Sequence, residues 1–152
     1  MMKIGITTLM SFMMLLASSY VLADSQMTYK YSDSELVQIM KDDGYNSVAK
    51  IKDGVIRIKI NGRSYILFNK NDGDLQCYYA IAGVKISYED INEWNLRKRL
   101  SRAYLDSDKD PTLESDLLAN AGLTTRHVTE FFRIFKDSVT IFRKFIIEHD
   151  KS

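Results

Sequence analysis

The segment Asp106 to Pro111, DSDKDP, alternates aspartates in the spacing that begins a calcium-binding loop. Carboxylate oxygens are the ligands that calcium prefers, so Asp106, Asp108 and Asp110 are candidate metal ligands. The positions that follow do not fit an EF-hand, because Pro111 stands where glycine is required and Leu117 where a bidentate glutamate is required. A polar hairpin turn is therefore the favoured interpretation, with a calcium loop as the less favoured alternative.

Candidates for acid, base or nucleophilic chemistry are few. Of the two histidines, His127 stands near an expected helix start, where capping or exposure is predicted, and His149 lies in a tail that we expect to fray. The single cysteine, Cys77, cannot form an internal disulfide and is expected to be a small buried apolar residue. Glycine-rich phosphate loops and zinc spacings are absent from the sequence, so we predict a protein that is not an enzyme and needs no cofactor or metal.

A cluster of cations follows the single tryptophan, Trp94, and could bind phosphate or nucleic acid. Between Ile91 and Leu118, however, the basic residues are matched by acidic ones; they are Arg97, Lys98, Arg99, Arg102 and Lys109 against Glu93, Asp106, Asp108, Asp110, Glu114 and Asp116. Arg102 can lie opposite Glu114 on adjacent strands. We therefore favour internal ion pairs over a phosphate site, and the balanced charge of the chain gives no reason to expect nucleic acid as a partner.

The first 23 residues have the pattern of a secretory signal peptide. One lysine precedes an apolar run, and Val21-Leu22-Ala23 supplies small residues for cleavage before Asp24. Cleavage predicts a periplasmic or secreted protein without membrane attachment, and removing Lys3 from 21 basic residues leaves 20 against 20 acidic residues. An uncleaved membrane anchor is the alternative. Residues 24–31 are interpreted as a polar lead and residues 32–150 as one domain.

The elements that would position these residues follow from local signals. A capping box at Ser32 and Glu35 begins a helix that Gly44 ends, and another helix begins at Ser87 and ends near residues 97–99. Three Asx-Gly pairs predict four consecutive antiparallel strands between the two helices; they are Asp53-Gly54, Asn61-Gly62 and Asp72-Gly73. Strands over 100–106 and 112–118 and a long helix from Thr124 or Thr125 complete the order. This predicts an α+β fold, in which a four-strand meander and a two-strand hairpin pack with three helices.

Two-residue turns would divide the strand residues between two faces. The predicted core face holds Ala49, Ile51, Ile56, Ile58, Ile60, Tyr65 and Leu67, and the other face holds Lys50, Val55, Arg57, Lys59, Ile66 and Phe68. Cations beside apolar side chains make Arg57, Lys59, Ile66 and Phe68 a candidate binding surface. The alternative is an ordinary, half-solvated sheet surface.

The long terminal helix carries two apolar stripes. The first recurs at helical period and is expected to pack on the sheet; it consists of Val128, Phe131, Phe132, Phe135, Val139, Phe142 and Ile146. The second stripe, Ile134, Ile141 and Phe145, needs a separate cover. Either another helix of the same chain or a second subunit could supply it, so these three residues are a candidate homodimer interface.

The runs INEWN, RLSRAYLD and DPTLESDLL resemble the signature of the YbjN family, bacterial proteins named as regulators of sensory transduction. The resemblance extends from the first capped helix to the terminal helix, although Leu100 and Ser115 depart from the family pattern. It implies a fold similar to type III secretion chaperones, often homodimeric, and no established catalytic residues. Within it, Trp94, Arg102, Tyr104 and Glu114 are interpreted as a structural signature.

These observations predict a non-enzymatic periplasmic protein that binds a protein partner as a chaperone-like or regulatory module. A small-ligand sensor, with its pocket between the helices and the strand of Tyr78 and Tyr79, is the alternative. A hydrolase with an unrecognised site is a third and weaker interpretation.

Overall fold

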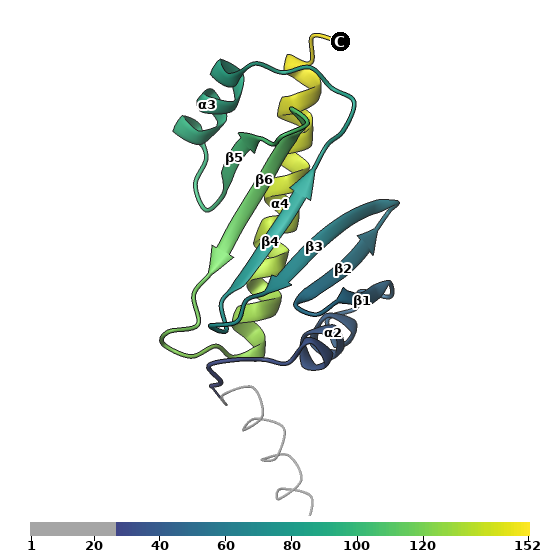
Figure 1. The fold of residues 1–152 in the computed structure, drawn as a ribbon, viewed down its shortest axis with the longest axis vertical. Helices are drawn as coiled ribbons and strands as arrows, with labels where there is room; N and C mark the ends of the chain where they lie inside the picture. Colours follow the sequence, from purple (N-terminus) through teal and green to yellow (C-terminus); the bar gives the residue numbers. More distant parts are fainter. Residues whose placement is uncertain (1–26) are drawn as a thin grey trace, which may run out of the picture.

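The computed structural model describes residues 27–152, which form a six-stranded antiparallel sheet and three helices (Figure 1). The predicted leader and the first residues of the predicted polar lead lie outside the described residues. The elements are α2 (Asp33–Asp42), β1 (Val48–Lys52), β2 (Val55–Ile60), β3 (Arg63–Asn69), β4 (Leu75–Ala80), α3 (Tyr88–Arg97), β5 (Arg102–Leu105), β6 (Pro111–Leu117) and α4 (Thr125–His149). The strand order is β1-β2-β3-β4-β6-β5. The predicted α+β class and element order are confirmed.

Each helix begins at a capping box, in which two residues satisfy backbone amides that have no partner within the helix. Ser32 pairs with Glu35 in α2, as predicted, and Ser87, the predicted start of α3, pairs with Asp90. In α4 the N-cap is Thr124, and its partner is His127, whose Nδ1 accepts from the Thr124 amide at 3.2 Å. His127 is therefore a capping residue.

The two-residue turn Asp53-Gly54 is present, but β1 carries a bulge that changes which of its residues face the core. Lys52 pairs with Val55, whereas Lys50, not Ile51, lies opposite Ile56. The extra residue rotates the rest of the strand by one position. As a result Val48 is buried and Ile51 is 51% exposed, so the prediction that Ala49 and Ile51 face the core and Lys50 faces away is wrong.

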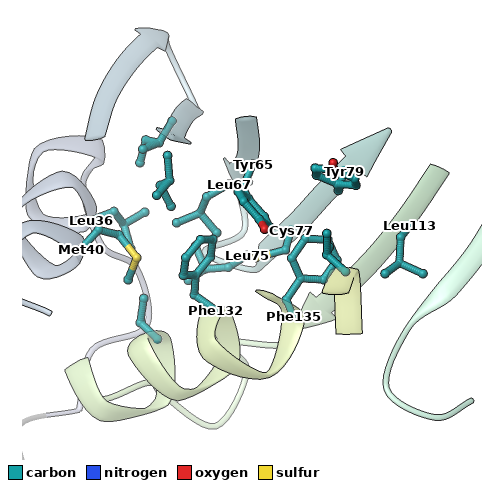
Figure 2. Packing of buried hydrophobic residues seen from close by; sticks show 14 of the residues in the cluster. Leu36, Met40, Tyr65, Leu67, Leu75, Cys77, Tyr79, Leu113, Phe132 and Phe135 are labelled. Carbon is teal, nitrogen blue, oxygen red and sulfur yellow. The ribbon is translucent and has the colours of Figure 1, made fainter. Parts of the chain in front are cut away.

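The core lies between one face of the sheet and α4, with α2 closing one end (Figure 2). Phe132 and Phe135 of α4 pack among inward side chains of β3, β4 and β6, and Leu36 and Met40 extend the cluster from α2. All residues of the first predicted stripe are buried except Phe131, which is half-buried against the core. Cys77 is fully buried, as predicted.

The segment that precedes α2 is part of the packed structure, which the prediction of a polar lead misses. Thr28 forms a β-bridge with Leu123, and the Tyr31 side chain is buried. The segment crosses the β3–β4 turn so closely that a Cβ at Gly73 would lie 2.0 Å from the Tyr29 carbonyl oxygen. Glycine is therefore required at this position, where φ is also positive.

The aspartate-rich segment forms the predicted polar hairpin turn between β5 and β6. The Asp106 carboxylate accepts hydrogen bonds from the amides of Asp108 at 3.0 Å and Asp110 at 2.9 Å. One of its oxygens, Oδ1, therefore accepts both hydrogen bonds from the turn itself. Within residues 27–152 no group of three or more acidic, histidine or cysteine side chains is arranged to hold a metal ion. Over the same residues, none of the helices is both long enough and apolar enough to span a membrane.

Candidate functional site

One face of the sheet is not covered by any helix of the described chain; we call it the open face. Figure 1 shows α4 running along the opposite face of the sheet. The strand registers place on the open face the four residues predicted as a binding surface, together with further side chains of β2 to β6; its members are Val55, Arg57, Lys59, Ile66, Phe68, Gln76, Tyr78, Arg102, Tyr104, Glu114 and Asp116.

A single row of five side chains crosses the open face at right angles to the strands. Arg57 lies opposite Ile66, Ile66 opposite Tyr78, Tyr78 opposite Glu114, and Glu114 opposite Arg102. The row thus has an aliphatic and an aromatic residue at its centre and an arginine at each end. Of these five residues, Arg57 and Ile66 were predicted as surface residues, whereas Arg102 and Glu114 were predicted as a framework ion pair. Tyr78 was not predicted in this row, because the longer β3–β4 turn leaves the register of β4 undetermined.

Glu114 anchors one end of this row. It is 7% exposed, and its two carboxylate oxygens accept from the Arg102 guanidinium and, at 2.6 Å, from the Tyr104 hydroxyl. The predicted pairing of Arg102 with Glu114 is therefore present. Burial and the hydrogen bond to Glu114 raise the pKa of Tyr104, so this hydroxyl stays protonated and keeps donating at neutral pH. The cluster is satisfied internally and fixes the shape of the surface.

Aromatic side chains form the apolar centre of the open face. Phe68 and Tyr78 meet edge to face with ring centroids 6.1 Å apart, and the Lys70 ammonium lies 4.7 Å from the Phe68 centroid. Gln76 donates to Asp116 at 2.9 Å beside them. Phe68 and Tyr78 are half-buried. Partly accessible aromatic groups beside arginine and lysine are typical of surfaces that bind proteins, because they combine apolar area with few rotatable bonds.

An open groove of about 980 Å³ adjoins the open face at the free edge of the sheet. It runs between the start of α2 and β1, and continues past the β1–β2 turn to Val55, Phe68 and Lys70. Lysines dominate its charged residues; they are Lys30, Lys41, Lys50 and Lys70, against Asp33 and Asp53.

Asp33 holds the walls of this groove together. Its carboxylate accepts from the Gly54 amide at 3.0 Å, from Asn69 Nδ2 at 2.8 Å and from Lys50 Nζ at 3.0 Å. These donors, the Gly54 amide first, lower the pKa of Asp33 to about 2. Asp33 therefore connects α2 to β3 and to the β1–β2 turn in its ionised form.

The remaining signature residue, Trp94, lies in α3, next to the opposite edge of the sheet. Trp94 is 1% exposed and packs on Phe142 of α4, with ring centroids 4.9 Å apart. Lys98 lies over the Trp94 ring, and Arg97 pairs with Glu93 within α3 at 2.9 Å. These two cations of the cluster that follows Trp94 therefore make contacts with residues of α3.

The second stripe of α4 divides into two parts. Phe145 is half-buried against Trp94 and stacks on His149, with ring centroids 5.6 Å and 4.1 Å away respectively. His149 is helical and its Nδ1 lies 2.8 Å from the Phe145 carbonyl oxygen, so the prediction of a frayed tail is wrong. Ile134 is half-buried, whereas Ile141 is 50% exposed.

Comparison with known proteins assigns the chain to a family. The model of the YbjN family, described as "Putative bacterial sensory transduction regulator", matches residues 32–148. The chain belongs to the YbjN family. Curated proteins give no match to this YbjN chain.

A solved structure with the same fold is that of the Yersinia pestis type III secretion chaperone SycH in complex with a stable fragment of YscM2. The two chains share 21% sequence identity with a TM-score of 0.53, and the match covers 75% of the YbjN chain and 98% of the chaperone chain. The YbjN chain therefore has a type III secretion chaperone-like fold, as the resemblance implies.

Proposed function

We propose that this YbjN protein is an exported, non-enzymatic module that binds a protein partner on the open face of its sheet. The observation that carries the proposal is the row Arg57, Ile66, Tyr78, Glu114 and Arg102, a firmly positioned apolar centre between two arginines on a face that no described helix covers. Such a surface suits a polypeptide that offers apolar side chains and an acidic side chain for Arg57, since Arg102 is already paired with Glu114.

Three further observations support the proposal. The chaperone SycH, which has the same fold, was crystallised with a fragment of a protein partner. The leader sequence supports export. Both histidines have structural contacts, since His127 caps a helix and His149 stacks on Phe145. The role of the module is then chaperone-like or regulatory. A second copy of the chain is a further partner, which would bind through the exposed Ile141 of α4.

Site-specific photo-crosslinking in living cells tests the proposal. A photoreactive phenylalanine analogue replaces Lys59, an exposed residue of the open face, or Lys144, an exposed residue of α4 on the other side of the molecule. We expect a discrete adduct with a protein other than the chain itself from position 59 and no such adduct from position 144. An equal yield from both positions, or no protein adduct at position 59, would contradict the assignment of the open face.

A further inference from the structure

Two arginines from distant parts of the sequence border one groove on the helix side of the sheet. Arg63 begins β3, on the same face as the buried Tyr65, and Arg143 lies in the second half of α4. The β2–β3 hairpin diverges from α4 towards its tip (Figure 1). Between the start of β3 and α4 is a groove of about 330 Å³, lined by Arg63, Thr140, Arg143, Lys144, Ile147 and Glu148.

Both guanidinium groups lie beside a pair of buried phenols. Arg143 Nη1 donates to the Tyr79 hydroxyl at 2.7 Å, and the Tyr79 ring packs on that of Tyr65 with centroids 5.2 Å apart. Burial raises the pKa of Tyr65, and the positive charges of Arg63 and Arg143 oppose part of that rise. The Tyr79 hydroxyl thus orients Arg143 without neutralising its charge.

The positive charge of this groove is not balanced by the described residues. No ion pair within 4.0 Å joins Arg63 or Arg143 to a carboxylate of residues 27–152. Glu148, the acidic residue of the groove, lies 3.9 Å from Lys144 instead. Each guanidinium therefore keeps most of its N–H donors available, in the planar arrangement that matches a carboxylate.

We propose that this groove binds a small organic carboxylate, held between Arg63 and Arg143 with its apolar part against Ile147. Ile147 is 67% exposed and gives the groove an apolar wall next to its cations. The volume of about 330 Å³ is at the lower end of the range for small-molecule pockets, which favours one small ligand over an extended polypeptide. The site is on the opposite side of the sheet from the open face and does not depend on the proposed function.

Nuclear magnetic resonance titration of the purified protein with hexanoate tests this site. Hexanamide, which has the same length without the charge, and inorganic phosphate are titrated in parallel. We expect saturable shifts for hexanoate confined to Arg63 and residues 140–148, and weaker shifts with hexanamide and phosphate. Arg63→Gln should weaken hexanoate binding about tenfold or more, since it removes charged hydrogen bonds at an exposed strand start and leaves the core intact.

Arg126→Gln is the matched control, because Arg126 is in the first turn of the same helix, outside the groove. Its affinity for hexanoate should equal that of the wild type. The proposal fails if hexanoate gives no saturable shifts, if hexanamide binds as tightly, or if Arg63→Gln binds as the wild type does. Tighter binding of phosphate than of hexanoate would overturn the assignment to carboxylates.

Discussion

The side-chain amide of Asn95 pairs with both backbone groups of Ala103. Asn95 Nδ2 donates to the Ala103 carbonyl oxygen at 2.9 Å, and the Ala103 amide donates to Asn95 Oδ1 at 2.9 Å. Ala103 is in β5, an edge strand, so the amide of a helix residue takes the place of the next strand. The asparagine that ends the INEWN motif thus protects the edge of the sheet, a role that its sequence position alone does not reveal.

Replacing Asn95 by alanine should therefore destabilise the protein and expose an edge. The loss of two hydrogen bonds at a half-buried site should lower the free energy of unfolding by about 1 to 3 kcal/mol. Urea unfolding measures this change, and light scattering during storage measures association through the freed edge. Asn46→Ala is the control, because Asn46 is in an exposed loop before β1. Equal stability of Asn95→Ala and the control would show that the pairing contributes nothing.

Trp94→Ala should be among the most destabilising substitutions in the chain. The ring is packed between Phe142 and Phe145, and removing it leaves a large cavity, which costs about 3 to 5 kcal/mol. Arg102→Ala should cost less, about 1 to 3 kcal/mol, because it leaves the Glu114 carboxylate, whose side chain is 9% exposed, with Tyr104 as its remaining side-chain donor. Thermal unfolding of both variants checks the order. A Trp94→Ala protein that melts like the wild type but loses its partner would instead make Trp94 a binding residue.

The parts of the fold that the sequence predicts are those set by neighbouring residues. Capping boxes at Ser32 and Ser87 fix two helix starts, and Asx-Gly pairs fix the hairpins, because each signal acts over a few residues. The bulge at Ile51 could not be predicted, because the inserted residue leaves no signal in the apolar alternation of β1 itself.

The candidate sites were predicted only in part, for a related reason. Arg57 and Ile66 share a face through one tight turn, so their register follows from sequence. Tyr78 joins their row only once the longer β3–β4 turn is known. Arg63 and Arg143 line one groove because α4 crosses the twisted sheet near the start of β3. No pattern of neighbouring residues in the sequence predicts this arrangement.

Stability should fall on acidification between about pH 4 and pH 2, and Asp33 should contribute to the fall. Its pKa is lowered from 3.8 to about 2 in the folded protein, so its contribution is complete above the unfolded pKa and is lost as pH falls through the folded pKa. Asp33→Asn should lower stability at pH 7 by about 1 to 2 kcal/mol, with solvent screening taken into account. Urea unfolding of both proteins from pH 7 to pH 2 measures the difference, which should shrink towards pH 2. A difference that is constant with pH would contradict the role of the ionised carboxylate.

Export should remove the leader. The mature chain is expected to begin at Asp24 and to fractionate with periplasmic contents, because the small residues that end at Ala23 suit a signal peptidase. Intact-mass spectrometry of the protein recovered from its own cells determines the first residue. A chain that keeps Met1 in the membrane fraction would show that the leader remains as an anchor.

The exposed part of the second α4 stripe should mediate association between two copies of the chain. Phe145 is covered by Trp94 within the chain, so only Ile141, with Ile134 two turns earlier, is left for a partner. An apolar side chain in water forgoes about 1.5 to 3 kcal/mol of burial, and a two-fold axis near Ile141 would cover the same residue in both subunits. Light scattering should therefore give a dimer for the wild type and a folded monomer for Ile141→Glu.

Leu96→Glu is the matched control for this substitution, because Leu96 is a more exposed apolar residue, at 79%, on α3. It should leave the dimer intact, so that the effect of Ile141→Glu is assigned to its position rather than to added charge. Circular dichroism on the same samples separates dissociation from unfolding. A wild-type protein that is already monomeric at tens of micromolar would refute the interface. If Ile141→Glu unfolded that monomer, Ile141 would belong to the packing of its own chain, because a glutamate at an exposed helix position has little effect on stability.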